Sequence, residues 1–284
     1  MNAIELTNVS YTYSPDTPFK KLALDNVSLS IRANAITGLM GHTGSGKSTL
    51  VQLINGLLKP DEGTVKVLGK DIWENPKDIH KLRFKVGLVF QYPEYQLFEE
   101  TVKRDIAFGP SNMKLPEEEI NNRVKIAAEL CGIENSVLDK SPFDLSGGQK
   151  RRVAIAGVMA MMPDILILDE PAAGLDPRGR EEILCGISEF RKEHNSTVII
   201  VSHSMEDMAK YSDDIVVMKN SGICVSGSKE EIFKKSELLS SVGLDVPTIT
   251  KLSSELASMG IPLDGGHYSV ESCVSALSEL LKNR

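Results

Sequence analysis

The segment Gly41-His-Thr-Gly-Ser-Gly-Lys47-Ser48 has the G-x-x-x-x-G-K-S pattern of a phosphate-binding loop. The apolar residues 35–40 before it predict a strand, and residues 47–57 predict the helix that follows. In this context the glycines let the backbone approach a β-phosphate, and the start of the helix adds positive potential. Lys47 is suited to neutralise phosphate oxygens and Ser48 to bind Mg²⁺. The segment predicts nucleoside triphosphate binding without separating a kinase, a GTPase or an ATPase.

A second glycine-rich segment, Leu145-Ser-Gly-Gly-Gln149, runs into a predicted helix. Its backbone N–H groups can be presented to another anion. Each of the two phosphate cradles is present once in the chain. Two cradles of different design predict that the nucleotide is clamped between two copies of the chain.

Short apolar segments alternate with amphipathic helical segments along most of the chain. Strands are predicted at residues 3–13, 22–31, 35–40, 64–68, 86–90, 165–168, 198–201 and 215–219. Asp176 and Pro177 are suited to begin a helix between two of the later strands. This order predicts an α/β fold, a mainly parallel sheet covered by helices, with antiparallel strands near the N-terminus.

The domain organisation is predicted from the helical periodicity of the remaining segments. Residues 98–162 are helical in pattern and predict an inserted helical subdomain. Ser228-Lys-Glu-Glu231 predicts the start of a further helix, and amphipathic helices follow around residues 249–256 and 270–281. We therefore expect a nucleotide-binding domain over residues 1–236 and a small helical C-terminal extension over 237–284. The apolar faces of the extension need a cover, which predicts a role in dimerisation.

Composition sets limits on the class of protein. The chain has 284 residues, 41% of them hydrophobic and 25% charged, as in an ordinary globular protein. Its net charge of −7 argues against sequence-independent nucleic-acid binding. The four cysteines form no C-x-x-C pair, so reduced thiols are expected rather than structural zinc. No signal peptide is apparent, and the longest apolar stretch, 153–162, is about half a bilayer span, so no membrane crossing is expected.

An acidic pair ends the strand in Ile165-Leu-Ile-Leu-Asp169-Glu170-Pro171. In a parallel sheet that end lies beside the phosphate-binding loop. Asp169 is suited to hold Mg²⁺ through its waters, and Glu170 is suited to act as the base for an attacking water. The alternative interpretation is a pair of solvated loop carboxylates.

Four further residues are candidates for the nucleotide site. His203 follows the strand 198–201, where an imidazole N–H is placed to stabilise developing charge on a γ-phosphate. Gln91 ends the strand 86–90, so its amide is a candidate contact for Mg²⁺ or for the attacking water. Tyr11 and Tyr13 alternate with Thr12, so one of them is expected to face the nucleotide and stack on adenine, the alternative being a core position.

Together these segments resemble the nucleotide-binding subunit of ATP-binding cassette (ABC) transporters over about residues 3–235, with every expected motif in order. The resemblance implies an ABC ATPase core with an antiparallel β subdomain and an inserted helical subdomain. It implies a D-loop at Asp176. His42, inside the phosphate-binding loop, would contact the phosphates with its backbone rather than with its ring. The implied ATP-binding residues are Tyr13, Gly41, His42, Thr43, Gly44, Ser45, Gly46, Lys47, Ser48 and Thr49.

The same resemblance implies the other parts of an ATPase site. The catalytic residues would be Glu170, His203 and Gln91, and Mg²⁺ would be held by Ser48, Gln91 and Asp169. The family signature, which would contact the ATP of a partner chain, corresponds to Leu145, Ser146, Gly147, Gly148 and Gln149. ATP and Mg²⁺ are thus the expected cofactors, in a dimer of identical or paralogous ATPase subunits.

A finer resemblance is to the ATPase component of energy-coupling factor (ECF) transporters, which import vitamins or transition-metal ions. It depends on Phe90-Gln-Tyr-Pro-Glu94-Tyr-Gln96-Leu-Phe98, Thr101-Val-x-x-Asp105-Ile-Ala-Phe-Gly109 and Gly243-Leu-Asp-Val-Pro247. It implies that Glu94, Gln96 and Phe98 contact a transmembrane coupling subunit, with Glu94 pairing with an arginine of a coupling helix. A separate substrate-binding membrane subunit would complete the complex at the cytoplasmic face of the cell membrane. The His-Thr-Gly-Ser-Gly loop favours the second of two paralogues.

The alternatives are other classes of protein that contain the same ATPase core. An ATPase of another ABC transporter class remains open, and a soluble ABC ATPase of DNA repair or translation is the more distant alternative. DNA-repair members carry long coiled-coil or zinc insertions and translation members carry two cassettes, whereas one signature is present here. A GTPase needs a guanine-specifying [NT]-K-x-D segment, and Thr250-Lys-Leu-Ser253 lacks the acid. The transported substrate is not encoded in this chain, because a membrane subunit would choose it.

Overall fold

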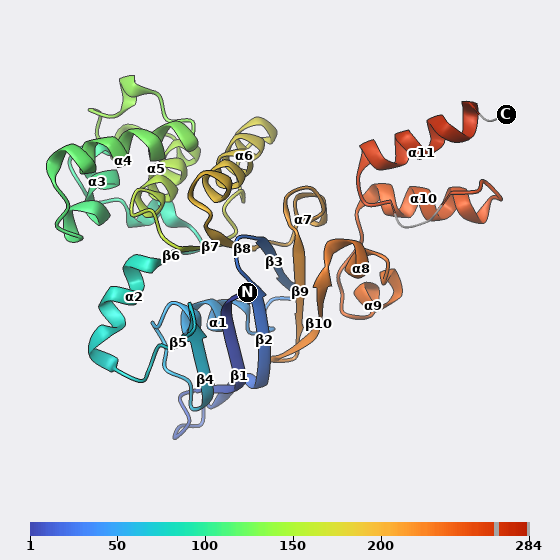
Figure 1. Cartoon of the computed structure of the whole chain (residues 1–284), viewed down its shortest axis with the longest axis horizontal. Helices are drawn as coiled ribbons and strands as arrows, with labels where there is room; N and C mark the ends of the chain where they lie inside the picture. The colour runs from blue at the N-terminus through green and yellow to red at the C-terminus, as the bar shows by residue number, and fades with distance from the viewer. Residues whose placement is uncertain (264–266, 283–284) are drawn as a thin grey trace.

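The computed structural model describes residues 1–263 and 267–282. Two sheets organise the described part of the chain (Figure 1). A four-stranded antiparallel sheet has the order β2-β1-β4-β5, and a six-stranded, mainly parallel sheet has the order β10-β9-β3-β8-β7-β6. The predicted α/β class, with antiparallel strands at the N-terminus, is therefore confirmed.

The parallel sheet brings the predicted functional segments to one edge. β3 (Ile36–Gly41) lies between β8 (Thr197–Val201) and β9 (Asp214–Lys219), and β7 (Ile165–Asp169) lies between β8 and β6 (Val86–Val89). All these pairs are parallel, so the carboxyl ends of the strands lie together. β10 (Gly222–Ser228) adds an antiparallel strand at the edge beside β9.

The helix after the phosphate-binding loop packs between the two sheets. α1 (Lys47–Ile54) follows the phosphate-binding loop, and its side chains Leu50, Leu53 and Ile54 are fully buried in a core shared with the antiparallel sheet. That sheet contains β1 (Asn2–Tyr13), β2 (Lys21–Arg32), β4 (Glu62–Val67) and β5 (Lys70–Asp71). α1 ends before the predicted residue 57, because the chain turns through Asn55 and Gly56, whose φ of 70° is left-handed.

Helices fill the chain between β6 and β7. They form the group at the left of Figure 1, drawn mainly in green, and they pack with α6 (Pro177–His194) over one face of the parallel sheet. The three α-helices are α3 (Val102–Asn112), α4 (Glu117–Leu130) and α5 (Gly147–Met159). Shorter elements not predicted from the sequence are α2 (Ile79–Lys85), α7 (Met205–Tyr211) and the 3-10 helices η1 (Pro76–Asp78), η2 (Pro93–Gln96), η3 (Asn135–Val137) and η4 (Pro142–Asp144).

The C-terminal helices lie at the other end of the longest axis (Figure 1). They are α8 (Lys229–Phe233), α9 (Ser236–Ser241), α10 (Thr248–Ser258) and α11 (Val270–Lys282). Leu239 and Leu244 are buried in the main core, so the predicted boundary at residue 236 falls inside a packed segment. By contrast, Val274 and Leu281 of α11 are 54% and 73% exposed. Among the described residues, no helix has the length and apolarity that a membrane span needs.

Candidate nucleotide-binding site

The phosphate-binding loop, residues 41–48, connects β3 to α1 and depends on its glycines. Gly41, Gly44 and Gly46 have φ values of 149°, 82° and 105°, which L side chains rarely adopt. A Cβ atom on Gly41 would lie 2.4 Å from the carbonyl oxygen of Met218. A Cβ on Gly46 would lie 2.6 Å from the carbonyl oxygen of Ala23. Sequence and packing therefore both require glycine at these two positions.

Lys47 places a buried cation inside the loop. Its ammonium donates to the carbonyl oxygens of Gly41, at 2.6 Å, and His42, at 3.1 Å. Burial lowers the pKa of Lys47, although the carboxylates of Asp169 and Glu170 act in the opposite direction. The loop thus holds a positive charge that an incoming polyphosphate can neutralise.

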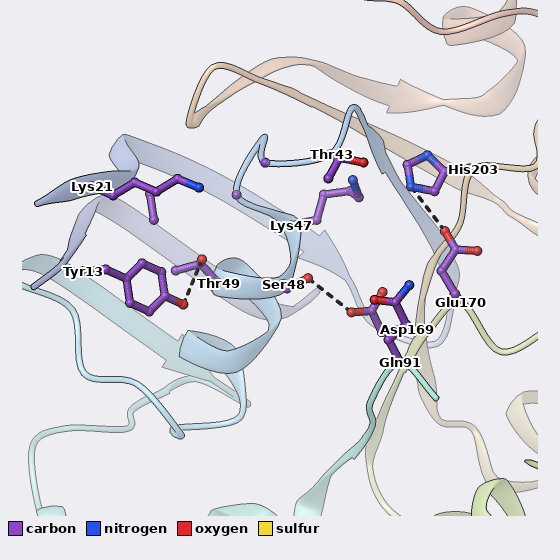
Figure 2. Close-up of a pocket in the computed structure, with 13 residues that line it drawn as sticks. Tyr13, Lys21, Thr43, Lys47, Ser48, Thr49, Gln91, Asp169, Glu170 and His203 are labelled. Carbon is purple, nitrogen blue, oxygen red and sulfur yellow. Dashed lines mark hydrogen bonds and ion pairs between the residues drawn. The ribbon is translucent and has the colours of Figure 1, made fainter. Parts of the chain in front are cut away.

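Asp169 ends β7 opposite the start of α1 (Figure 2). The Ser48 hydroxyl donates to Asp169 Oδ2 at 3.3 Å, and Gln91 lines the same cavity. Burial raises the pKa of Asp169, while the Ser48 hydrogen bond and the Lys47 charge lower it. Carboxylate, hydroxyl and amide oxygens are the ligands that Mg²⁺ prefers, so this donor set fits that ion.

Glu170 and His203 lie next to each other in the lining of the cavity (Figure 2). Glu170 Oε1 lies 3.6 Å from His203 Nε2. Glu170 has a φ of 53°, an uncommon value for a residue other than glycine, and its N–H donates to the Val201 carbonyl oxygen at 2.9 Å. Burial and the neighbouring Asp169 raise the pKa of Glu170 to about 7. Burial and Lys47 lower the pKa of His203, so a neutral imidazole faces this carboxyl group.

One cavity of about 200 Å³ unites these groups, and the close-up in Figure 2 shows their side chains converging on it. Tyr13 lines its outer part, with its hydroxyl 3.2 Å from Thr49 Oγ1, whereas the ring of Tyr11 packs edge-on against Tyr13. Lys21, a residue that sequence reasoning missed, also lines the cavity. The sequence indicated Lys21 only indirectly, because its place beside the candidate Tyr13 depends on the pairing of β1 with β2. The lining residues are Tyr13, Lys21, Ala23, Thr43, Gly44, Gly46, Lys47, Ser48, Thr49, Gln91, Asp169, Glu170 and His203.

Three residues of the predicted ATP set take part in the loop without lining the cavity. They are Gly41, His42 and Ser45. The ring Nδ1 of His42 lies 2.9 Å from the Thr43 carbonyl oxygen, and the Ser45 side chain is fully buried. These positions shape the loop, and the backbone contribution of His42 to phosphate binding stays a prediction.

The signature segment lies apart from this cavity within one chain. Ser146 caps α5 in a reciprocal capping box with Gln149, so the helix start is fixed. Leu145 and Gln149 line a different cavity of about 490 Å³, which Asp176 also lines. Ser146 and Gly147 are exposed. The segment is therefore free to meet a nucleotide held elsewhere than in its own phosphate loop.

The predicted coupling residues occupy η2 and the turn after it. Glu94 accepts hydrogen bonds on both carboxylate oxygens from Arg151 of α5, at 3.0 and 3.2 Å, with the Arg151 side chain only 5% exposed. This internal partner was not foreseen for Glu94. Gln96 and Phe98 line a groove of about 300 Å³ between η2, α3 and α5. Tyr92, Tyr95 and Phe98 are exposed.

The arrangement as a whole can bind a triphosphate and activate water at its terminal phosphate. The loop and Lys47 supply positive potential, and the carboxylates of Asp169 and Glu170 and the imidazole of His203 line the same cavity.

Comparison with protein families supports this chemistry. The ABC transporter family profile matches residues 24–173, and a second profile, described as an AAA domain, matches residues 139–208. The chain is similar to the "Energy-coupling factor transporter ATP-binding protein EcfA2" of Clostridium acetobutylicum, with 52% identity over 99% of this chain and 98% of that protein. The protein of the same name from Geobacillus kaustophilus is 45% identical over 98% and 97% of the two chains.

Solved structures show the same fold. The structure of cbiO1 from Clostridium perfringens, described as part of the ABC transporter complex cbiONQ, has a TM-score of 0.76 and 40% identity and covers 92% of this chain and 99% of that one. The ATP-binding cassette MJ0796, a dimer bound to ADP and Pi, has a TM-score of 0.72 and 29% identity and covers 79% and 98%. The chain therefore belongs to the ABC ATPase family and, within it, to the ATP-binding proteins of energy-coupling factor transporters.

Proposed function

We propose that this ATPase hydrolyses ATP with Glu170 as the general base, and that it does so at a site completed by the signature segment of a second subunit. The observation that carries the proposal is the convergence of Lys47, Glu170 and His203 on one cavity. Glu170 accepts a proton from the attacking water. Its carboxyl pKa of about 7 suits a group that must take up a proton and release it near neutral pH.

The other side chains bind and orient the triphosphate. Lys47 and the loop N–H groups hold the β- and γ-phosphates. The His203 imidazole donates to a γ-phosphate oxygen, and its lowered pKa keeps it a neutral donor. Tyr13 stacks on adenine, since its half-exposed ring borders the cavity.

Mg²⁺ completes the site in this proposal. Ser48, Asp169 and Gln91 are the side chains that would hold it, directly or through water. When bound, the ion neutralises charge on the phosphate oxygens.

The transport partners follow from the family. The relatives are subunits of energy-coupling factor transporters by name, and cbiO1 is part of a multi-subunit complex. We infer a peripheral subunit at the cytoplasmic face of the cell membrane, which powers uptake of a vitamin or transition-metal ion chosen by a membrane protein. The exposed residues Tyr92, Tyr95 and Phe98, beside the groove that Gln96 lines, are the surface offered to the coupling subunit.

Two variants test the catalytic assignment. Glu170→Gln should keep ATP affinity and lose at least ~10²-fold in turnover. Lys47→Ala should lose ATP binding, because the loop then lacks its cation. Binding is measured with a fluorescent ATP analogue and turnover by phosphate release. Turnover near wild type in purified Glu170→Gln would reject Glu170 as the base.

A further inference from the structure

Arg180 connects α6, which begins directly after Asp176, to α7, which begins after the loop that carries His203. Arg180 lies near the start of α6, and its guanidinium forms hydrogen bonds with Asp207 of α7. Arg180 Nε donates to both carboxylate oxygens of Asp207 at 2.9 Å, and Nη2 donates to Oδ2 at 2.7 Å. Nη2 also donates to the hydroxyl oxygen of Ser204. Asp207 is largely buried, with 13% of its side chain exposed, so this pair is partly shielded from water.

The same contacts fix the short loop that carries His203. Ser204 caps α7, because its hydroxyl accepts from the Asp207 N–H at 3.2 Å. The Ser204 N–H in turn donates to the Ser202 hydroxyl at 3.1 Å. His203 lies between these two serines, and its own side chain is 54% exposed. The backbone on either side of His203 is therefore held by hydrogen bonds, and Arg180 anchors it through Ser204.

α6 connects this anchor to the segment before it. Asp176 caps α6, with its Oδ1 accepting from the Gly179 N–H at 2.6 Å. A cavity of about 250 Å³ is lined by residues 170–175 and by Arg180, and Ser204 and Asp207 also line it. This cavity shares Glu170 and His203 with the nucleotide cavity. Arg180 thus lies where the Asp176 segment, the His203 loop and the general base come together.

We propose that Arg180 is a positioning residue for ATP hydrolysis, which holds the His203 imidazole towards the γ-phosphate and makes its position depend on the segment ending at Asp176. The proposal rests on the role proposed above for His203. Arginine suits the task because its planar fork contacts Asp207 and Ser204 at once, which a lysine ammonium does in a less defined geometry. A small displacement of a catalytic group lowers the rate of the chemical step more than it lowers substrate affinity.

The test compares Arg180→Met with a control variant that loses another arginine–aspartate pair of the same helix. Arg191→Met removes another α6 arginine that pairs with an aspartate, since Arg191 Nη2 donates to Asp213 Oδ2 at 3.3 Å. We expect Arg180→Met to keep ATP affinity within about twofold and to lower turnover by about 10- to 100-fold. Arg191→Met should lower thermal stability without this loss of turnover. Equal turnover in the two variants would overturn the proposal.

A double-mutant cycle with His203→Ala separates positioning from general damage. If Arg180 acts through His203, then Arg180→Met should lower turnover less than about twofold in the His203→Ala background. The same fold loss in both backgrounds would overturn the positioning role while leaving that of His203 intact. Wild-type turnover in His203→Ala alone would overturn the role of His203 and this proposal with it. If Arg180→Met does not fold, Arg180→Lys replaces it in both backgrounds, because lysine keeps the charge without the planar fork. The same turnover results then support or overturn the proposal.

Discussion

Lys47 and Glu170 are held in the nucleotide cavity in surroundings that disfavour their charged forms. Burial lowers the pKa of Lys47 and raises that of Glu170 to about 7. Both effects arise because the protein interior solvates an ion less well than water does. The nucleotide-free chain therefore carries a local loss of stability at the residues that act on the substrate, as is common at functional sites.

A pH-dependent stability follows for Glu170 in nucleotide-free, metal-free buffer. Its folded pKa of about 7 exceeds the ordinary 4.5, so folding favours the protonated form and the chain loses stability as pH rises through this interval. Glutamine stays neutral. Glu170→Gln should therefore be more stable than wild type by on the order of 2 kcal/mol at pH 8, with a much smaller difference at pH 5. Urea unfolding at both pH values measures this.

The control for that experiment is Glu189→Gln, an exposed position on α6. It should change stability little at either pH. A Glu170→Gln difference of the same size at pH 5 and pH 8 would contradict the assigned shift.

At the level of elements, η2 is tied to the helix that begins at the signature. Glu94 and Arg151 make this connection with both members largely buried. If Glu94 also contacts a coupling-helix arginine, Glu94→Arg should leave ATP binding intact while weakening assembly with the membrane subunit and abolishing transport. The structure adds that it leaves Arg151 facing a like charge, at a cost on the order of 2 kcal/mol or more. Thermal unfolding of Glu94→Arg should show that loss, and an unchanged unfolding temperature would contradict it.

Because Glu94 has this internal partner, an exposed neighbour gives a sharper test of the docking surface. Tyr95 is 85% exposed, and Phe19, on the β1–β2 connection, is 84% exposed. Tyr95→Asp should leave ATP binding and stability unchanged but weaken co-purification with the membrane subunits and reduce uptake. Phe19→Asp should weaken neither co-purification with the membrane subunits nor uptake. Normal uptake in cells that rely on Tyr95→Asp would remove this surface from coupling.

At the scale of the whole molecule, the two phosphate cradles do not meet within one chain. Leu145 and Gln149 line a cavity different from the one that contains Lys47. A head-to-tail dimer would bring the signature of one subunit to the nucleotide of the other, and the MJ0796 cassette is a dimer in its structure. Ser146→Arg should therefore abolish turnover while the isolated variant binds ATP like wild type. ATPase activity that stays linear in concentration down to demonstrated monomers would contradict the composite site.

The C-terminal extension is predicted to hold that dimer when nucleotide has left. A chain ending near Lys235 would lose Leu239 and Leu244 from the main core, so it should also lose stability. A chain ending at Val246 keeps them and removes α10 and α11, together with Tyr268, whose ring stacks on Phe233. It should retain ATP binding and become monomeric in nucleotide-free buffer, measured by light scattering. An unchanged dimer would assign the extension another task.

The sequence by itself determined the parts of this protein whose geometry is local. A glycine-rich loop between a buried strand and a helix has few possible conformations, so the positions of Gly41, Gly46 and Lys47 followed from their order along the chain. The ends of parallel strands lie at one edge of the sheet, which also brought Asp169 and His203 to the same cavity.

Only the tertiary structure decided which side chains meet across separate elements. Lys21 enters the cavity through the register of β1 with β2, and Glu94 finds Arg151 57 residues away. Arg180 reaches Asp207 because α6 and α7 pack together. Hydrophobic periodicity shows which face of an element is buried, but it does not fix the angle and offset at which two elements pack. Those depend on the whole core, and they determine the partner of each long charged side chain.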